Sequence, residues 1–272
     1  MVKIGIITDK FHLENKISEF LKYLKTKAKV SIYIEESYIL NNFNANFDED
    51  LFFVKGKGKI MIGLARLIEN ETTIPIINSP RAILLTMNRL FNSTLLQKAE
   101  IKIPDFSFIP YNYPPPFEDF IVKNIIDQKK YKFKPIIKKI NHHINVFDER
   151  ALKEVDGEKE NYLYFYYQKF IKSKWEYKVY GFGDNLFFYK QIPILVNPNK
   201  METRKKIDEI EELKEMSLKT MKIFDLKAAS LDFLKSKSGE YFLTDVNCLP
   251  NFNYIENGPK KFADFLISQA AK

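Results

Sequence analysis

The chain of 272 residues contains one cysteine, Cys248, and this scarcity excludes an internal disulfide and a cysteine-based zinc cluster. Such cysteine usage fits a reducing compartment. No candidate base stands beside Cys248 in the sequence, so we expect this side chain to pack near a hairpin end rather than to react. A Ser-His-Asp or Cys-His arrangement is also missing, and the sequence therefore offers no nucleophile for covalent catalysis.

Long hydrophobic runs are absent too, because no stretch of about 18 uncharged apolar residues occurs. Residues 1–7 have the pattern of a short strand and lack the core of a signal peptide. An apolar content of 45% supports a globular chain with one large domain or a few small ones. These features predict a soluble, cytoplasmic protein with no membrane partner.

Glycine motifs that cradle phosphates are missing as well. No Gly-x-Gly-x-x-Gly follows the first expected strand, which argues against a dinucleotide site. The segment Lys55-Gly56-Lys57-Gly58-Lys59 lacks the Walker spacing and its Ser or Thr. We expect a flexible basic turn there, with a contact to a substrate phosphate as the alternative.

Basic residues exceed acidic ones, 43 to 35, and the net charge of +8 predicts an anionic partner. The excess gathers in residues 129–139 and in Arg204-Lys205-Lys206. Nucleotide phosphates or an acidic small substrate would satisfy it. No nucleic-acid-binding motif accompanies the charge, so the sequence does not favour nucleic acid as the partner.

Apolar periodicity predicts alternating strands and helices in the first third of the chain. The expected order is a strand at residues 3–8, a helix at 14–24, strands at 30–35 and 51–54, a helix at 60–68 and a strand at 74–77. Such an order predicts a small parallel-sheet domain.

The rest of the chain has more strands. We expect helices at residues 81–98, 117–128, 149–155 and 202–223, strands at 106–109, 133–140, 145–147 and 162–171, and an antiparallel pair at 178–181 and 185–191 turned by Gly183-Asp184.

A C-terminal hairpin over residues 230–247 carries the strongest functional signal. If Ser238-Gly239 forms the tight turn, Asp232 lies opposite Asp245, and the two-residue side-chain period puts Asn247 on the same face. Facing carboxylates destabilise a bare sheet, and Mg²⁺ would relieve their repulsion. The hairpin therefore predicts a metal site for a nucleotide; a solvent-exposed acidic face is the alternative.

In this order of elements the chain resembles the ATP-grasp superfamily, specifically its glutathione-synthetase/RimK-like branch, and the related inositol-trisphosphate kinases. The segments Asn78-Ser79-Pro80-Arg81-Ala82-Ile83 and Ala99-Glu100-Ile101-Lys102-Ile103-Pro104-Asp105 are similar to the two ends of one family stretch. The resemblance implies an α/β chain with an α+β catalytic part. Its expected divisions are an N-terminal domain at 1–95, a small ATP-grasp subdomain at 96–172 and a metal-binding subdomain at 173–272.

The resemblance also implies site residues. Asp232, Asp245 and Asn247 fall on the family's magnesium positions. Gln168, Lys169, Phe170 and Ile171 are similar to a strand that lines adenine, with Lys169 replacing the usual acid. Lys178, and Lys190 on the next strand, would face phosphate or substrate as catalytic residues.

The lysine that meets the phosphates is less directly indicated. Pro135-Ile136-Ile137-Lys138-Lys139-Ile140 resembles a family strand and favours Lys139, with Lys134 and Lys138 as alternatives. His142 and His143 stand where the family has a Gly-rich lid; we expect an exposed turn there, with a contact to an anionic substrate as the alternative.

What the resemblance implies is an ATP- and Mg²⁺-dependent carboxylate–amine ligase that acts through an acylphosphate on an amino acid, a peptide or an acidic metabolite. A kinase of a small polyol phosphate and a nucleotide-binding protein without catalysis are the alternatives. The expected partners are ATP and a small anionic substrate, and homo-oligomerisation stays open.

Overall fold

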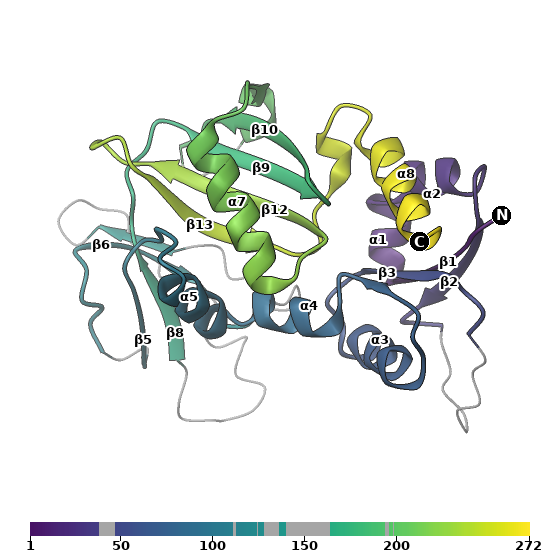
Figure 1. Ribbon diagram of the computed structural model, residues 1–272. Coiled ribbons are helices and arrows are strands. Elements are labelled where there is room, and N and C mark those ends of the chain that lie inside the picture. Colours follow the sequence, from purple (N-terminus) through teal and green to yellow (C-terminus); the bar gives the residue numbers. More distant parts are fainter. Residues whose placement is uncertain are drawn as a thin grey trace.

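The computed structural model describes residues 1–37, 47–110, 113–123, 125–127, 136–139, 164–193, 196–197 and 199–272. Within them the chain forms three sheets that lie along an elongated molecule (Figure 1). The predicted helix at 149–155, the predicted strand at 145–147 and the histidines His142 and His143 lie outside the described residues. No helix in the described ranges is long and apolar enough to cross a membrane.

The first sheet is parallel, as predicted, with strand order β2-β1-β3-β4. Its strands are β1 (Lys3–Thr8), β2 (Lys29–Ile34), β3 (Leu51–Lys55) and β4 (Ile76–Ile77), and α3 (Lys59–Glu71) connects the last two. The helix predicted at 14–24 is wrong in extent. It is two helices, α1 (Lys10–Asn15), which Asp9 caps, and α2 (Ser18–Leu24), with the break at Lys16 and Ile17.

The helix predicted over 81–98 is also two helices, α4 (Pro80–Met87) and α5 (Arg89–Lys98). Asn88 separates them, because its backbone is extended and its side-chain oxygen accepts hydrogen bonds from the amides of Leu90 (3.0 Å) and Phe91 (3.3 Å). An asparagine that caps a helix start in this way competes with continuation of the preceding helix. The second helix begins at Arg89 as a result.

The second sheet is antiparallel, in the order β5-β8-β6-β7, and comprises β5 (Phe106–Pro110), β6 (Asp119–Lys123), β7 (Ile136–Lys139) and β8 (Tyr164–Lys169). The helix predicted over 117–128 is therefore wrong. Phe120 and Val122 are buried while Asp119 and Ile121 are not, which is the period-two pattern of a strand. Two flanking strands pair with β6 and outweigh its local helical pattern.

The third sheet, also antiparallel, has the order β11-β10-β9-β12-β13. Its strands are β9 (Glu176–Phe182), β10 (Asn185–Gln191), β11 (Lys205–Lys206), β12 (Ala228–Lys235) and β13 (Tyr241–Asn247). The helix α7 (Glu211–Phe224) lies across one face (Figure 1). The helix predicted at 202–223 is wrong at its start, because its basic residues pair with the edge of β10 instead.

The hairpin confirms the pairing of Asp232 with Asp245 but not the predicted turn. Lys235 pairs with Tyr241 across a longer loop, and a β-bulge between Asp232 and Phe233 then shifts the register by one residue. The bulge therefore restores the pairing that a tight Ser238-Gly239 turn would have produced. Thr244 is the extra residue, and its hydroxyl donates to the carbonyl of Asp232 (3.0 Å).

The last helix, α8 (Gly258–Ala270), returns to the N-terminal sheet and lies beside α2 (Figure 1). Its Phe262 and Leu266 are buried in one cluster with Phe20 of α2 and Phe53 of β3. The N-terminal sheet is thus covered by helices from both ends of the chain.

Asn78 joins the N-terminal part to the third sheet. Its side chain donates to the carbonyls of Ala228 and Cys248 (both 2.6 Å) and accepts from the amides of Lys227 (2.7 Å) and Ala228 (3.1 Å), and it is buried. All of its polar atoms are therefore satisfied by the backbone at the start of β12 and just after β13.

Replacing Asn78 with Ala is expected to lower the free energy of unfolding by about 2–4 kcal/mol, because four backbone groups lose a buried partner. Urea denaturation measures the change. The exposed Asn15, which makes one hydrogen bond to the carbonyl of Phe11 (3.0 Å), is the matched control, and Asn15→Ala should cost less than about 1 kcal/mol. Equal losses in the two variants would contradict the role of Asn78.

Candidate active site

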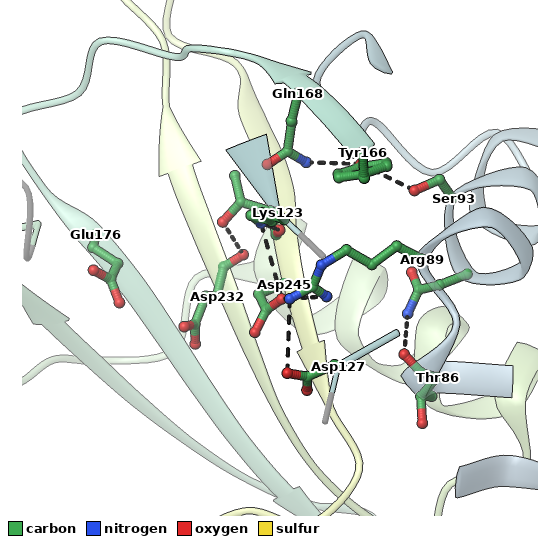
Figure 2. Close-up of polar contacts among 12 residues, drawn as sticks. Thr86, Arg89, Ser93, Lys123, Asp127, Tyr166, Gln168, Glu176, Asp232 and Asp245 are labelled. Atoms are coloured by element: carbon green, nitrogen blue, oxygen red, sulfur yellow. Dashed lines mark hydrogen bonds and ion pairs between the residues drawn. The ribbon is translucent and has the colours of Figure 1, made fainter. Parts of the chain in front are cut away.

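The functional side chains share one face of the third sheet. Lys178 on β9 pairs with Asp232 on β12, which in turn pairs with Asp245 on β13. Directly paired residues lie on the same face of a sheet. Figure 2 shows the carboxylates of Glu176, Asp232 and Asp245 on these neighbouring strands. The other face packs on α7 through a buried apolar cluster that includes Val179, Leu231, Phe233, Leu243, Val246, Leu213, Met221 and Phe224.

Asp232 is held by Lys178. The ammonium nitrogen lies 2.6 Å from Oδ1 and 2.7 Å from Oδ2 of the carboxylate, and only the second contact has hydrogen-bond geometry. Oδ1 is buried and has no hydrogen-bond partner among the described residues. Burial disfavours the charged form of Lys178, yet Asp232, Tyr180 and Glu176 outweigh it and raise the pKa of Lys178 above its usual range.

Asp245 faces two cations at longer range. Nη1 of Arg89 lies 3.7 Å and Nζ of Lys123 lies 3.9 Å from Oδ1 of Asp245. Burial alone would raise the pKa of Asp245, but Lys123, Arg89 and Lys57 lower it below the usual value, so the carboxylate is ionised. Contacts of this length leave both cations able to take other anionic oxygens.

Lys123 was not among the predicted site residues. It ends β6 and donates to the carbonyl of Thr244 (2.8 Å), a group at the bulge of the hairpin (Figure 2). Burial lowers the pKa of Lys123 to about 8, with Asp245 opposing the shift and Arg89 adding to it. The signal was present as Phe120-Ile121-Val122-Lys123, an apolar strand that ends in a lysine, and the helix prediction concealed it.

Two more cations reach the site from elsewhere. Arg89 begins α5, and its Nη2 lies 3.9 Å from Oδ1 of Asp127. Lys57 comes from the loop between β3 and α3 and forms an ion pair with the same carboxylate. The basic turn predicted at 55–59 therefore supplies a side chain to this site. Lys55 is buried instead, and its ammonium donates to the carbonyls of Leu249 (2.8 Å) and Pro250 (2.5 Å).

The strand predicted to line adenine is β8 and the residues after it. Gln168 is buried, donates to the hydroxyl of Tyr166 (3.2 Å), and lines a narrow cavity together with Arg89, Lys123 and Asp245. The Lys169 side chain is exposed and pairs with Asp105 (2.9 Å). The amide of Lys169 donates to the carbonyl of Asp105 (2.8 Å), and the amide of Phe170 donates to the carbonyl of Asp119 (2.9 Å). A main-chain contact between this strand and a nucleotide base would therefore use the carbonyls of the strand or the amide of Ile171.

One predicted lysine, Lys190, is not brought to this face. Lys190 pairs with Tyr177, which alternates with Glu176 and Lys178, so Lys190 lies on the opposite side of the sheet, with Nζ 5.2 Å from the centre of the Trp175 ring. Lys139 pairs with Asp119, at the end of β6 away from Lys123. Lys138 pairs with Phe120, and Lys134 lies outside the described residues.

Replacing Lys190 with Met is expected to leave the affinity for Mg²⁺·ADP within about twofold of the unchanged chain, because the side chain lies on the opposite face. Lys178→Met should weaken it roughly tenfold or more, since a charged partner on the site face is lost. Titration calorimetry compares the two. An equal loss of Mg²⁺·ADP affinity in both variants would show that the face of the sheet does not decide which lysine contributes to binding.

The donor set suits a hard cation together with phosphates. Asp232, Asp245 and Asn247 carry two carboxylates and an amide oxygen, and the amide oxygen already accepts from the backbone amide of Leu249 (3.0 Å). Mg²⁺ takes such oxygens and completes its shell with phosphate and water. The buried Oδ1 of Asp232 contacts the ammonium of Lys178 (2.6 Å) without hydrogen-bond geometry, so it keeps lone-pair capacity for a metal ion. No cluster of three or more His, Cys, Asp or Glu side chains fit for a metal occurs in the described part of the chain.

Comparisons with known proteins identify the fold. No family model matches the chain. The α-aminoadipate–LysW ligase LysX of Saccharolobus solfataricus is 22% identical to this chain over an alignment of 278 residues. The alignment covers 91% of this chain and 94% of that protein. The ATP-grasp ligase PsnB, solved with a minimal precursor, Mg and ADP, superposes with a TM-score of 0.72 at 14% identity, covering 98% of this chain and 97% of that one.

Two further solved structures agree. A RimK-domain ATP-grasp protein from Sphaerobacter thermophilus has a TM-score of 0.69 at 12% identity, covering 98% of this chain and all (100%) of the other. The D-alanine–D-alanine ligase of Bacillus anthracis has a TM-score of 0.66 at 16% identity, covering 100% and 98%. The chain therefore has the ATP-grasp fold, as the sequence predicted. A relation to inositol-trisphosphate kinases is not shown.

Proposed function

We propose that this protein is an ATP- and Mg²⁺-dependent carboxylate–amine ligase. The observation that carries the proposal is the convergence of Asp232 and Asp245 with Lys178, Lys123 and Arg89, which come from three separate parts of the chain, on one face of the third sheet. A structural hairpin with surface acids would not need three cations around its two facing carboxylates. The shared ATP-grasp fold supports the same conclusion.

Each residue has a proposed role. Asp232, Asp245 and Asn247 would hold the metal, which when bound neutralises phosphate charge. Lys123 and Arg89, whose contacts with Asp245 are long, would hold phosphate oxygens, and Lys178 would join them from β9. Gln168, Lys169, Phe170 and Ile171 remain the proposed base-binding strand, through main-chain groups and the Gln168 side chain rather than through Lys169, which points to Asp105.

The proposed reaction needs no protein nucleophile. An oxygen of the substrate carboxylate attacks the γ-phosphorus of ATP, the bond to the β-phosphate oxygen breaks, and ADP leaves. The amine then attacks the carbonyl carbon of the acylphosphate, the carbon–oxygen bond to phosphate breaks, and the amine loses a proton. The protein positions the reactants and stabilises negative charge through its lysines and arginine.

The substrates of the similar proteins differ. By their names, one relative is an α-aminoadipate–LysW ligase and one neighbour is a D-alanine–D-alanine ligase, and PsnB was also solved with a precursor peptide. A shared fold does not carry a shared substrate. We therefore propose an amino acid, a peptide or an acidic metabolite as the carboxylate substrate.

Phosphate release from ATP, measured with a panel of acids and with hydroxylamine as a general amine, tests the proposal. Release that requires both the acid and the amine, with formation of a hydroxamate, is the expected result. A phosphorylated alcohol from a polyol phosphate would identify a kinase instead. Binding of Mg²⁺·ATP without turnover on any of the acids or on a polyol phosphate would favour a protein without catalysis.

A further inference from the structure

Arg204 belongs to the basic segment Arg204-Lys205-Lys206, which the nucleotide site described above does not use. It was expected inside a helix, but it lies between a 3₁₀ turn (Lys200–Thr203) and β11 with extended backbone angles, φ −68° and ψ 127°. In this conformation its guanidinium reaches back over the third sheet. Nε donates to the side-chain oxygen of Gln191 (2.8 Å), and Nη1 donates to the hydroxyl of Tyr180 (3.0 Å).

The partners of Arg204 are neutral. Gln191 is an amide, and burial raises the pKa of Tyr180 to about 12, so its hydroxyl keeps its proton. The guanidinium carbon also lies 4.8 Å from the centre of the Tyr254 ring. Arg204 forms no ion pair with a carboxylate of the described residues, whereas Lys178, Lys123, Arg89 and Lys57 all do.

The position of Arg204 links it to the site. Gln191 pairs with Glu176, and its amide nitrogen donates to Oε1 of Glu176 (3.0 Å). Tyr180 lies two residues along β9 from Lys178, on the same face, because side chains alternate along a strand. Arg204 thus borders the site from the β10 side.

Arg89 and Lys123 border the same face from the opposite side, at β13. Lys178 and Asp232 lie between, on the two central strands β9 and β12. A nucleotide held at the β13 side therefore leaves the β10 side, where Arg204 lies, for the second reactant.

The chemistry selects a carboxylate. An arginine has five N–H donors, and the two hydrogen bonds to Gln191 and Tyr180 use two of them. The planar guanidinium matches a carboxylate with parallel hydrogen bonds. The Tyr254 ring, 4.8 Å away, and the two neutral partners hold the guanidinium without neutralising its charge. A cation prepared in this way and lacking an acidic partner among the described residues is suited to an anionic ligand.

We propose that Arg204 binds the carboxylate of the acid substrate, on the side of Lys178 and Asp232 away from the nucleotide. This inference rests on the proposed ligase function and extends it, because it assigns a residue to the second reactant. Lys205 and Lys206 are exposed and take no part in the binding.

Two measurements test the proposal. The first is labelling of arginines with phenylglyoxal in the presence of Mg²⁺·ADP, read by mass spectrometry, with glutarate and α-aminoadipate as carboxylate probes and chloride as the control anion. Slower modification of Arg204 with a carboxylate than with chloride is expected. Equal rates of modification with all three anions would overturn the proposal, whether or not the protein is a ligase.

The second measurement uses the acid that supports phosphate release. Arg204→Gln and Arg204→Lys should raise the KM for this acid roughly 10- to 100-fold and leave the affinity for Mg²⁺·ADP within about threefold. Lys206→Met, which removes a charge from the same segment, is the matched control and should change neither. An unchanged KM for the acid in the Arg204 variants, or an equal loss of nucleotide affinity, would overturn the proposal.

The two measurements separate the two hypotheses. Protection of Arg204 without acid-dependent turnover by the unchanged protein would support the carboxylate site and refute the ligase. Turnover with no protection and an unchanged KM would support the ligase and refute the role of Arg204. Thermal unfolding of each variant, expected near that of the unchanged chain for Arg204→Lys, separates a loss of binding from a loss of folding.

Discussion

Replacing Asp232 with Asn is expected to weaken binding of Mg²⁺·ADP roughly 100-fold or more and to abolish turnover. The substitution keeps the shape of the side chain but removes the negative charge that a divalent cation requires. It also leaves the ammonium of Lys178, now 2.6 Å from Oδ1, without its main counter-charge. Largely buried and without that counter-charge, Lys178 would then repel the metal that Asp232 had attracted.

A stability loss should accompany this loss of binding. Removing one partner of a buried ion pair is costly, and since the Asp232 side chain is 20% exposed, we expect about 2–3 kcal/mol in the free energy of unfolding. The double variant Asp232→Asn with Lys178→Met should recover part of the stability, because the ammonium that lost its counter-charge is gone, but none of the metal binding. Urea denaturation and Mn²⁺ electron paramagnetic resonance with ADP measure the two effects separately.

The control for Asp232 is a carboxylate outside the site. Asp225 is exposed and pairs with Lys227 (2.9 Å), so Asp225→Asn should change stability by less than about 1 kcal/mol and leave metal binding intact. Normal Mn²⁺ binding by the folded Asp232→Asn variant in the presence of ADP would refute the metal site at the hairpin.

Lys123→Met is expected to weaken nucleotide binding roughly 10- to 150-fold, whereas Lys139→Met should change it by less than about threefold. Lys123 borders the two acids of the site, and Met replaces its length and apolar stem while removing the charge that would meet phosphate. Lys139 pairs at the other end of β6, about 13 Å away along the strand at 3.3 Å per residue. Titration calorimetry with ADP and Mg²⁺ compares the variants.

Comparing the variants of Lys123 and Lys139 tests which of the two lysines meets the phosphates. The pattern around 135–140 favours Lys139, and the geometry favours Lys123. A large loss in Lys139→Met with little change in Lys123→Met would restore the sequence interpretation and would mean that the second sheet meets the nucleotide through β7. Equal stabilities of the two variants are required for the comparison, and thermal unfolding checks them.

Local pattern was a reliable guide where one strand or one hairpin contains the whole signal. The period of two placed Asp232, Asp245 and Asn247 on one face, and it held although the turn was longer than predicted, because the bulge at Thr244 returned the register. The same period, applied to the β9–β10 pair, excludes Lys190 from that face, since Lys190 lies opposite Tyr177 and not opposite Lys178.

Boundaries of elements were less predictable, since neighbours decide them. Residues 117–128 and 202–223 have helical patterns, yet β7 and β8 pair with the first and β10 with the start of the second. Each error concealed a cation to which we assign a proposed role, Lys123 in one case and Arg204 in the other. An isolated sequence window cannot show that a strand from another part of the chain will complete its hydrogen bonds.

The sequence by itself determined the parallel N-terminal sheet and the acidic hairpin, because hydrophobic period and residue order specify strands, helices and their succession. The ATP-grasp fold came from the resemblance of its segments to a known family. Tertiary structure alone decided which cations surround the hairpin. Lys57, Arg89 and Lys123 come from a loop, a helix start and a strand end. Only the packing of these parts against the third sheet brings Arg89 and Lys123 to Asp245, and Lys57 to the neighbouring Asp127. Electrostatic contacts between residues far apart in the sequence produce no periodic pattern in the sequence, whereas a strand produces a period of two residues.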